Sequence, residues 1–399
     1  EFDMRVDDLQ LFLQCDSRDG VSLFDHTSGV STDIARGFSQ REGVDFFHTF
    51  SPTPKMTTLR VLLHVAAQRD YELHSLDFST AFLQGRHDKA IWLCRRKGFT
   101  ELFSKGTEWS LQRPVYGLCQ VPHEWHDALR TTLAALGFAP STADPSLFLR
   151  IDTTLPLLYA ELQERHTCTD LGPPALWLPI LLATAHSPIY RPLALNPPLD
   201  ESKELSGPYP ELVGCLIISG MGLVVGGRGS VVLTGHSDAS WADDHATQRS
   251  SQGYTFSLGS GSVSWRSPHS FSVLGSSCEA EIYAGAMAAQ ELPWLTYLLT
   301  YLGERTRCPP VLYIDNKAML ALCHEQRLEH RTKHIALRYF LARELQQRRQ
   351  LRLSYVASRA NTADVFTKAL GSGDHQRFYT TLGLVPTLPC YSHNRLECA

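Results

Sequence analysis

Apolar and polar positions follow regular patterns in two stretches of the chain, with an irregular stretch between them. In the first stretch, residues 57–70 carry apolar side chains at helical spacing, and an apolar strand runs into Asp77. Residues 122–136 predict a second helix. Residues 151–230 change character several times and are rich in proline. They therefore predict no regular order of elements.

The second stretch, from residue 231 onward, predicts three strands, a long helix, a strand, two helices, a strand and a final helix. These are expected at residues 231–240, 251–259, 261–267, 276–303, 311–316, 317–325, 331–348, 351–358 and 361–370. Ser276 or Ser277 would cap the long helix, and Pro293 should interrupt and kink it at a cost of about 3 kcal/mol. The order predicts an α/β (α+β) domain, a mixed sheet with flanking helices.

Four acidic residues stand at the ends of these expected elements: Asp238, Glu281, Asp315 and Asp364. A single aspartate at a strand end is usually a solvated turn residue, but four in distinct contexts suggest a shared site. They lie far apart in sequence, so only the fold can bring them together. Clustered like charges are costly unless cations compensate them. Hard oxygen ligands suit Mg²⁺ or Mn²⁺, and two such ions about 4 Å apart can promote phosphodiester hydrolysis.

Residues 231–370 resemble the ribonuclease H domain that ends a copia-type retrotransposon polyprotein. The matching runs are SDASWA, RSSQGYTFSLGSGSVSW, SSCEAEIYA, LYIDNKAM, RTKHIALRYFLARE and YVASRANTADVFTKAL. The resemblance implies hydrolysis of the RNA strand of an RNA–DNA hybrid with two Mg²⁺ or Mn²⁺ ions. It assigns the catalytic, metal-binding carboxylates to Asp238, Glu281, Asp315 and Asp364.

Two choices within this region depend on local pattern. Glu279 and Glu281 are two residues apart, so on a helix they point to different faces. The run Ala280-Glu281-Ile282 matches the ribonuclease H pattern and favours Glu281. Trp241 and Trp265 are expected in the core rather than as platforms for stacking bases.

A cationic helix is expected to carry Arg331, Lys333, His334 and Arg338. One interpretation is contact with the backbone of a hybrid duplex, because cations there neutralise phosphates. The other is a solvated cationic face. The sequence leaves both open.

Residues 35–150 resemble the fingers and palm of a copia-type reverse transcriptase. The evidence is ARGFSQREGVDFFHTFSP, MTTLRVLLHVAAQRDYELHSLDFSTAFLQG and VYGLCQVPHEWHDALRTTLAALGFAPSTADPSLF. A palm needs one aspartate at the end of a strand and a second pair in a later hairpin, which together hold two Mg²⁺ ions. Asp77 matches the first aspartate. Gln120 lies in the segment that supports template and primer.

The second pair of palm carboxylates is missing, because the tyrosine-x-aspartate-aspartate hairpin expected after residue 150 is absent. We infer a deletion and expect that polymerase activity is lost. Asp7 and Asp8 precede Asp77, which is the wrong order for a palm. Cys119 and His123 replace residues that tend to be basic, which weakens the expected contact with nucleic acid.

Composition sets bounds on these hypotheses. The net charge of −4 does not itself indicate nucleic-acid binding, and 43% apolar content is ordinary for globular domains. Ten cysteines without a CxxC pair suggest reduced thiols in an intracellular protein, in the cytoplasm or nucleus. No apolar run is long enough to suggest a membrane span. The chain begins at Glu1 and is expected to be a fragment.

We therefore expect a Pol-derived chain with a truncated reverse transcriptase region and a ribonuclease H domain that acts on RNA–DNA hybrids or other nucleic acid. The alternative is a non-catalytic relic that binds nucleic acid. The expected parts are an irregular segment at 1–33, the polymerase region at 34–150, a rearranged connection at 151–230, the ribonuclease H-like domain at 231–372 and a tail at 373–399.

Overall fold

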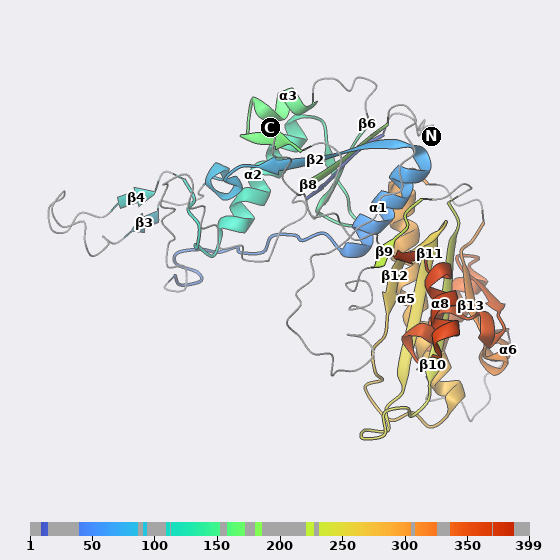
Figure 1. Cartoon of the computed structure of the whole chain (residues 1–399). Coiled ribbons are helices and arrows are strands. Elements are labelled where there is room, and N and C mark those ends of the chain that lie inside the picture. Colours follow the sequence, from blue (N-terminus) through green and yellow to red (C-terminus); the bar gives the residue numbers. More distant parts are fainter. Residues whose placement is uncertain are drawn as a thin grey trace, which may run out of the picture. The chain divides into compact units, whose positions relative to one another are not determined.

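The structure is a computed structural model that forms two compact units (Figure 1). One unit contains Glu1–Met4, Met56–Tyr71 and His186–Ala399, and the other contains Arg5–Lys55 and Glu72–Ala185. The structure describes residues 9–14, 40–86, 91–93, 109–111, 113–151, 158–171, 180–185, 221–226, 231–304, 308–324, 336–368 and 370–386.

A five-stranded mixed sheet organises the first unit, as the sequence predicts. Its order is β12-β11-β10-β13-β14. The first three strands pair antiparallel, whereas β13 runs parallel to β10 and β14 runs parallel to β13. The bounds are β10 (Leu233–Ser240), β11 (Ser251–Leu258), β12 (Gly261–Arg266), β13 (Val311–Ile314) and β14 (Arg352–Tyr355).

Helices cover both faces of this sheet; Figure 1 shows α5 behind it and α8 in front. The helices are α5 (Ser277–Tyr301), α6 (Lys317–His324), α7 (Ala336–Gln347) and α8 (Ser372–Thr381). The prediction of one helix over residues 361–370 is wrong. Two short 3₁₀ helices, η5 (Ser358–Ala360) and η6 (Thr362–Phe366), stand before α8 instead. Asn361 begins η6 by accepting a hydrogen bond from the N–H of Ala363 at 3.3 Å.

Pro293 lies inside α5, which continues to Tyr301. The predicted interruption is therefore wrong. A proline removes one backbone donor and crowds the preceding turn. Pro293 itself is exposed, whereas Ala289, whose carbonyl loses its helical partner, is fully buried. The buried face, with Leu292 and Leu295, remains continuous.

The first unit also contains an early helix and a small second sheet. The helix α1 (Met56–Arg69) is apolar over most of its length, and Arg60 lies over the ring of Trp265 on β12, 3.9 Å from its centroid. The strands β9 (Met221–Leu223) and β15 (Leu384–Pro386) pair antiparallel. The expected boundaries had placed α1 with residues 34–150 and residues 373–399 in a tail, whereas the structure groups α1, α8 and β15 with the five-stranded sheet.

The second unit is built on a six-stranded sheet of order β5-β6-β1-β8-β2-β7. The strand β1 pairs antiparallel with both β6 and β8, so the expectation that residues 1–33 are irregular is wrong for this strand. Its run LQLFLQ is too short for its periodicity to stand out from the polar residues around it. The bounds are β1 (Leu9–Gln14), β2 (Tyr71–Phe78), β5 (Ala139–Pro140), β6 (Leu147–Ile151), β7 (Cys168–Asp170) and β8 (Ile180–Ala185).

The helix α2 (Val121–Ala135) supplies the core of this unit. Trp125, Leu129 and Leu133 on one face of α2 are buried in a cluster with Leu76 and Phe148 from the sheet. The remaining described elements are η3 (Ala81–Gln84), α3 (Leu158–Gln163) and a separate pair of strands, β3 (Ile91–Leu93) and β4 (Trp109–Leu111). Four elements, α3, β7, β8 and β9, thus come from the stretch at residues 151–230.

Candidate functional site

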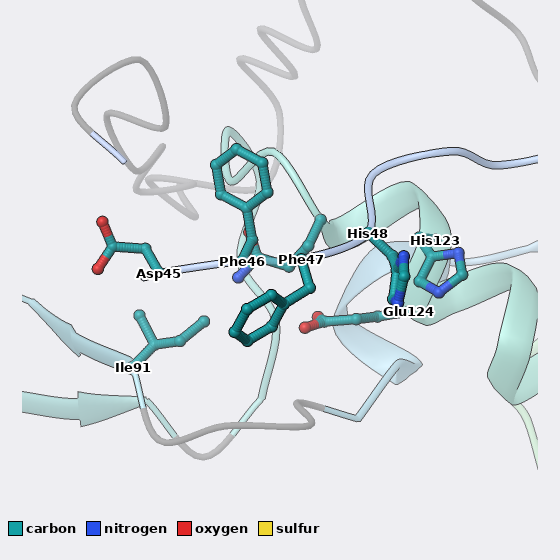
Figure 2. Close-up of a pocket in the computed structure, with 8 residues that line it drawn as sticks. Asp45, Phe46, Phe47, His48, Ile91, His123 and Glu124 are labelled. Atoms are coloured by element: carbon teal, nitrogen blue, oxygen red, sulfur yellow. The ribbon is translucent and has the colours of Figure 1, made fainter. Parts of the chain in front are cut away.

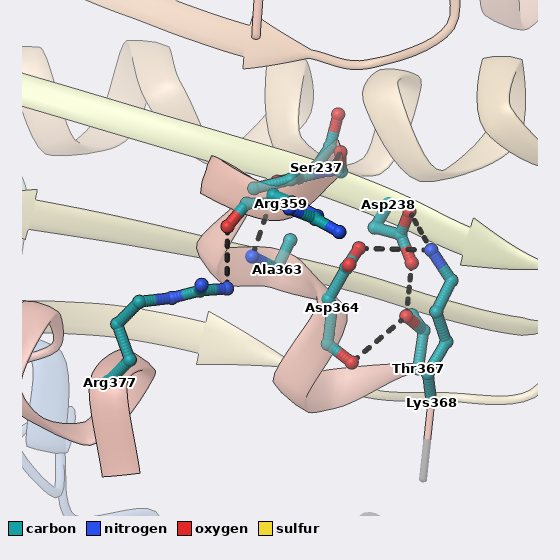
Figure 3. A network of polar contacts seen from close by, with 9 residues as sticks. Ser237, Asp238, Arg359, Ala363, Asp364, Thr367, Lys368 and Arg377 are labelled. Carbon is teal, nitrogen blue, oxygen red and sulfur yellow. Dashed lines mark hydrogen bonds and ion pairs between the residues drawn. The ribbon is translucent and has the colours of Figure 1, made fainter. Parts of the chain in front are cut away.

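The site is centred on Asp238, which lies near the end of β10 and has a fully buried side chain. Both of its carboxylate oxygens accept hydrogen bonds. The hydroxyl of Thr367 donates to Oδ2, and the ammonium of Lys368 lies 3.0 Å from Oδ1 (Figure 3). A buried carboxylate needs such partners because it has lost its hydration.

Asp315 reaches the same place because β13 runs parallel to β10. Ser237 stands opposite Ile314 in this pairing, so the next residue of each strand, Asp238 and Asp315, is a carboxylate. Asp315 is partly exposed. The side chain of the following residue, Asn316, accepts a hydrogen bond from the N–H of Met319 at 2.9 Å, so α6 begins immediately after the site.

The start of α5 decides between the two candidate glutamates. Ser276 caps the helix by accepting from the N–H of Glu279 at 3.1 Å, and the carboxylate of Glu279 accepts from the N–H of Gly275 at 2.7 Å. Glu279 is thus engaged at the N-terminus of the helix, where it accepts from the residue before the cap. Glu281, two residues further on, faces Asp238 and Asp315. Among the residues that the structure describes, these three carboxylates offer ligand atoms within 4.8 Å of one another.

Of these three carboxyl groups, Glu281 has the one whose ionised form is clearly disfavoured by its surroundings. Burial, followed by repulsion from Asp238 and Asp315, raises its pKa to about 9. Its Oε2 atom is buried and has no hydrogen-bond partner. A divalent cation would relieve both conditions, because it would bind the unpartnered oxygen and favour the ionised carboxylate. The three residues therefore fit a hard metal ion.

Asp364 approaches Asp238 from the other side, on η6. The side-chain amide of Asn361 donates to the carbonyl of Ser237 at 3.0 Å and thereby ties η6 to β10. Lys368 Nζ lies 3.0 Å from Asp364 Oδ1, so the ammonium bridges Asp364 and Asp238 (Figure 3). Burial and the charge of Asp238 raise the pKa of Asp364 to about 7. The two carboxylates on either side raise the pKa of Lys368 despite its burial.

A glycine makes this approach possible. Gly253 on β11 stands directly opposite Asp238 in the antiparallel pairing. A Cβ atom at this position would lie 2.8 Å from the side chains of both Phe366 and Thr367. The absence of a side chain therefore lets η6 lie against the sheet beside Asp238.

The structure thus brings Asp238, Glu281 and Asp315 into one group and joins Asp364 to it through Lys368. Their catalytic and metal-binding roles stay predictions. Sequence reasoning missed Thr367 and Lys368. A signal was present, because they follow Asp364 by three and four residues, a spacing that places side chains on one side of a helical turn.

The expectation for the tryptophans is half right. Trp265 is partly buried and packs against the cluster of Val365 and Phe366. Trp241 is instead 50% exposed, so its placement in the core is wrong. Its indole N–H donates to the carbonyl of Leu274 at 2.9 Å, which holds the ring at the surface just after β10.

The predicted cationic helix is described only in part. Arg331, Lys333 and His334 lie outside the described residues. Arg338 belongs to α7, of which the backbone is described at this position. Their contact with nucleic acid stays a prediction.

In the second unit, Asp77 lies one residue before the end of β2, opposite Thr169 on β7. It is partly buried, and burial together with the charge of Asp77 raises the pKa of Tyr116. Within the described ranges, Asp77 belongs to no group of three metal-ligating side chains. Asp7 and Asp8 lie outside those ranges.

Gln120, the predicted contact to template and primer, is buried at the start of α2. Its Oε1 accepts a hydrogen bond from the side chain of Gln40 at 3.1 Å. It also lines a hollow of about 150 Å³ (Figure 2) whose other walls include His48, His123 and Glu124. His123 Nδ1 lies 2.8 Å from the carbonyl of Phe50, so this ring is held by the backbone. The role of Gln120 stays a prediction.

Residues 27–161 match the family described as reverse transcriptase (RNA-dependent DNA polymerase). The chain is 29% identical over 444 residues to the retrovirus-related Pol polyprotein from transposon RE1 of Arabidopsis thaliana, across 89% of this chain and 30% of that protein. It is 25% identical to the corresponding polyprotein from transposon TNT 1-94 of Nicotiana tabacum, across 84% of this chain and 33% of that protein.

The solved structures to which this chain is similar include a crystal structure of LC11-RNase H1 in complex with an RNA/DNA hybrid. It is 11% identical and covers 34% of this chain and 93% of that one, with a TM-score of 0.26. No helix in the described part of the chain is long and apolar enough to cross a membrane.

The family match and the five-stranded mixed sheet define a chain with a reverse transcriptase region followed by a ribonuclease H-like fold. Over most of its length the chain is similar to the retrovirus-related Pol polyproteins of plant transposons. The chain spans about a third of the length of these relatives.

Proposed function

We propose that this chain hydrolyses the RNA strand of RNA–DNA hybrids with divalent ions held at Asp238, Glu281 and Asp315. The observation that carries the proposal is the convergence of these three carboxylates within 4.8 Å, from two strand ends and one helix. Carboxylates are brought this close at a substantial electrostatic cost, which a bound cation offsets.

Mg²⁺ is the ion that best suits this set, and Mn²⁺ would serve similarly, because every available ligand is a hard oxygen. When bound, two such ions would activate a water molecule and stabilise the leaving oxygen of the phosphodiester. Glu281 would offer the buried oxygen that has no partner in the chain. Asp315, which is partly exposed, would face the substrate, and Asp364 would complete the set.

Cleavage of a labelled RNA–DNA hybrid in MgCl₂ by the full chain tests this proposal. The variant Asp315→Asn keeps the shape of the side chain and removes its charge, so cleavage should fall about 100-fold or more. Asp374→Asn is the matched control, because Asp374 is an exposed carboxylate that pairs with Arg377 at the start of α8. It should cut like the unchanged chain. A folded chain that cuts no hybrid would favour the non-catalytic relic.

We further propose that the reverse transcriptase region does not polymerise. The setting of Asp77 supports this, since among the described residues it belongs to no group of three side chains that could hold a metal ion. The aligned stretch with RE1 spans 444 positions, more than the 399 residues of the chain, so RE1 carries segments that have no counterpart here. Both observations are consistent with the deletion inferred from the sequence.

A further inference from the structure

The acidic site has two halves that share Asp238. On one side, Asp238, Glu281 and Asp315 offer ligand atoms within 4.8 Å of one another, and no described cation of the chain bridges them. On the other side, Lys368 Nζ lies 3.0 Å from both Asp238 Oδ1 and Asp364 Oδ1. Among the described residues, the ammonium of Lys368 therefore contacts carboxylates in only one half of the site.

An ammonium in this position competes directly with a metal ion. It donates hydrogen bonds to the lone pairs that an ion bound between Asp238 and Asp364 would need. It also repels a divalent ion across a few ångströms in a partly buried setting, where screening is weak. The three-carboxylate half lacks this obstacle and keeps the unpartnered Oε2 of Glu281.

Lys368 also has room to move. Its side chain is 36% exposed, whereas that of Asp238 is fully buried. The residue follows η6, and its long stem can carry the ammonium toward solvent. The pairing with Asp364 is four residues apart on the same turn, so it can persist or break without moving the backbone.

We propose that Lys368 is a positioning residue that acts as a built-in cation between Asp238 and Asp364. The first divalent ion binds at Asp238, Glu281 and Asp315, and a second ion binds between Asp238 and Asp364 only when the ammonium swings away. This inference rests on the proposed function and adds an order of occupation to the site. It makes the second ion the weakly bound one.

Calorimetric titration of the full chain with MnCl₂ tests the inference without relying on catalysis. Lys368→Met removes the charge and keeps most of the stem, and Lys368→Gln provides a second neutral variant if the first fails to fold. Lys368→Arg keeps a cation in place. Arg348→Met is the matched control, because it removes a surface cation that pairs with Glu344, away from the site.

In both neutral variants the second Mn²⁺ should bind about tenfold or more tightly than in the unchanged chain. Lys368→Arg and Arg348→Met should bind as the unchanged chain does. The melting temperature gives a second readout. Lys368→Met should melt lower than the unchanged chain in EDTA, since two carboxylates then face each other unpaired, and should gain more from added MnCl₂.

Two contrary results are distinguishable. If the unchanged chain binds Mn²⁺ in a manner that Asp315→Asn abolishes, and folded Lys368→Met and Lys368→Gln bind with the same number and affinity, then Lys368 does not compete and this inference is overturned while the proposed function stands. If none of the folded proteins binds Mn²⁺, the proposed function and the inference both fail.

Discussion

At the residue scale, buried ionisable groups in this chain serve different purposes. Glu281 and Asp364 are buried beside like charges, and this arrangement suits cation binding. His64 on α1 is also buried, and the nearby charge of Arg60 further disfavours its protonated form. Its Nδ1 lies 2.9 Å from the carbonyl of Arg60, and its Nε2 has no hydrogen-bond partner. The ring must therefore stay neutral in the folded chain.

Because His64 is buried, we expect the folded chain to lose stability in mild acid. Burial, the main cause, lowers the pKa of His64 from 6.5 to about 4. Below about pH 6.5, His64 binds a proton in the unfolded chain but not in the folded chain. The stability that the neutral ring contributes is therefore present at neutral pH and is lost as the pH falls toward the pKa of the folded state. Between about pH 7 and about pH 5, His64→Gln should lose about 1–2 kcal/mol less unfolding free energy than the unchanged chain.

Urea unfolding at the two pH values measures this difference. His245→Gln is the control, because His245 lies on the exposed turn between β10 and β11. It should follow the unchanged chain. Equal pH dependence for His64→Gln and the unchanged chain would show that this ring is protonated in the folded state.

At the element scale, the short 3₁₀ helix η6 and the early helix α1 matter most. The apolar periodicity of neither helix determines where it packs in the fold. The helix η6 is held by Asn361, which bonds to the carbonyl of Ser237, and by the space above Gly253. The helix α1 is held by Arg69, whose guanidinium bonds both oxygens of Glu304 at 2.7 and 2.9 Å. A few specific hydrogen bonds and one close approach at a glycine thus help to position these two helices.

Gly253→Ala should displace η6. The new methyl group would meet Phe366 and Thr367 at 2.8 Å, which is closer than side-chain atoms approach. We expect a loss of about 1–3 kcal/mol of unfolding free energy and weaker hybrid cleavage, because Asp364 and Lys368 move with η6. Gly373→Ala is the matched control, since nothing lies within 4 Å of its new methyl group.

Thermal melting and hybrid cleavage measure the effect of Gly253→Ala. The control lies inside α8, where alanine is a better helix former than glycine, so its melting temperature should stay the same or rise. If Gly253→Ala is as stable and active as the unchanged chain, η6 does not depend on the close approach at β11.

Arg69→Met should destabilise the unit that contains the five-stranded sheet. Glu304 is almost fully buried, and without Arg69 its carboxylate loses both of those hydrogen bonds. We expect a cost of about 1–3 kcal/mol, less than for a fully buried pair because Arg69 is 41% exposed. Arg348→Met, which breaks an exposed pair, should cost at most about 1 kcal/mol. Urea midpoints compare the two, and equal costs would show that the pair does not anchor α1.

At the scale of the whole molecule, the chain joins two regions that differ in the acidic groups they offer to metal ions. In the ribonuclease H-like fold, Asp238, Glu281 and Asp315 offer ligand atoms within 4.8 Å of one another, whereas Asp77 in the reverse transcriptase region belongs to no comparable group among the described residues. Metal-dependent phosphoryl chemistry needs several ligands at one point. The two regions can therefore differ in activity although they share one chain.

Primer extension measures this difference directly. The full chain, supplied with a primed RNA template, deoxynucleotides and MgCl₂, should add no nucleotides, because one palm aspartate cannot hold the two ions that nucleotide addition requires. A copia-type reverse transcriptase with an intact hairpin is the positive control. Extension that Asp77→Asn abolishes would mean that carboxylates from another segment complete the palm.

Local chemistry made much of the first unit predictable. The strands β10 to β14, the cap of α5 and the four acidic positions all depend on residues close together in sequence, where period and capping pattern are informative. The sequence also separated Glu281 from Glu279, because two residues on a helix point in different directions. The sequence by itself therefore determined which elements form and which residues carry the charge.

Only the tertiary structure decided how those elements meet. The packing of α1 with the five-stranded sheet, the place of β1 between β6 and β8, and the ammonium of Lys368 between Asp238 and Asp364 all join residues far apart in the chain. Such contacts depend on shape and burial across the whole fold, and no local pattern encodes them. Pro293 is the converse case, because α5 continues through it to Tyr301 although the local rule is that a proline breaks a helix.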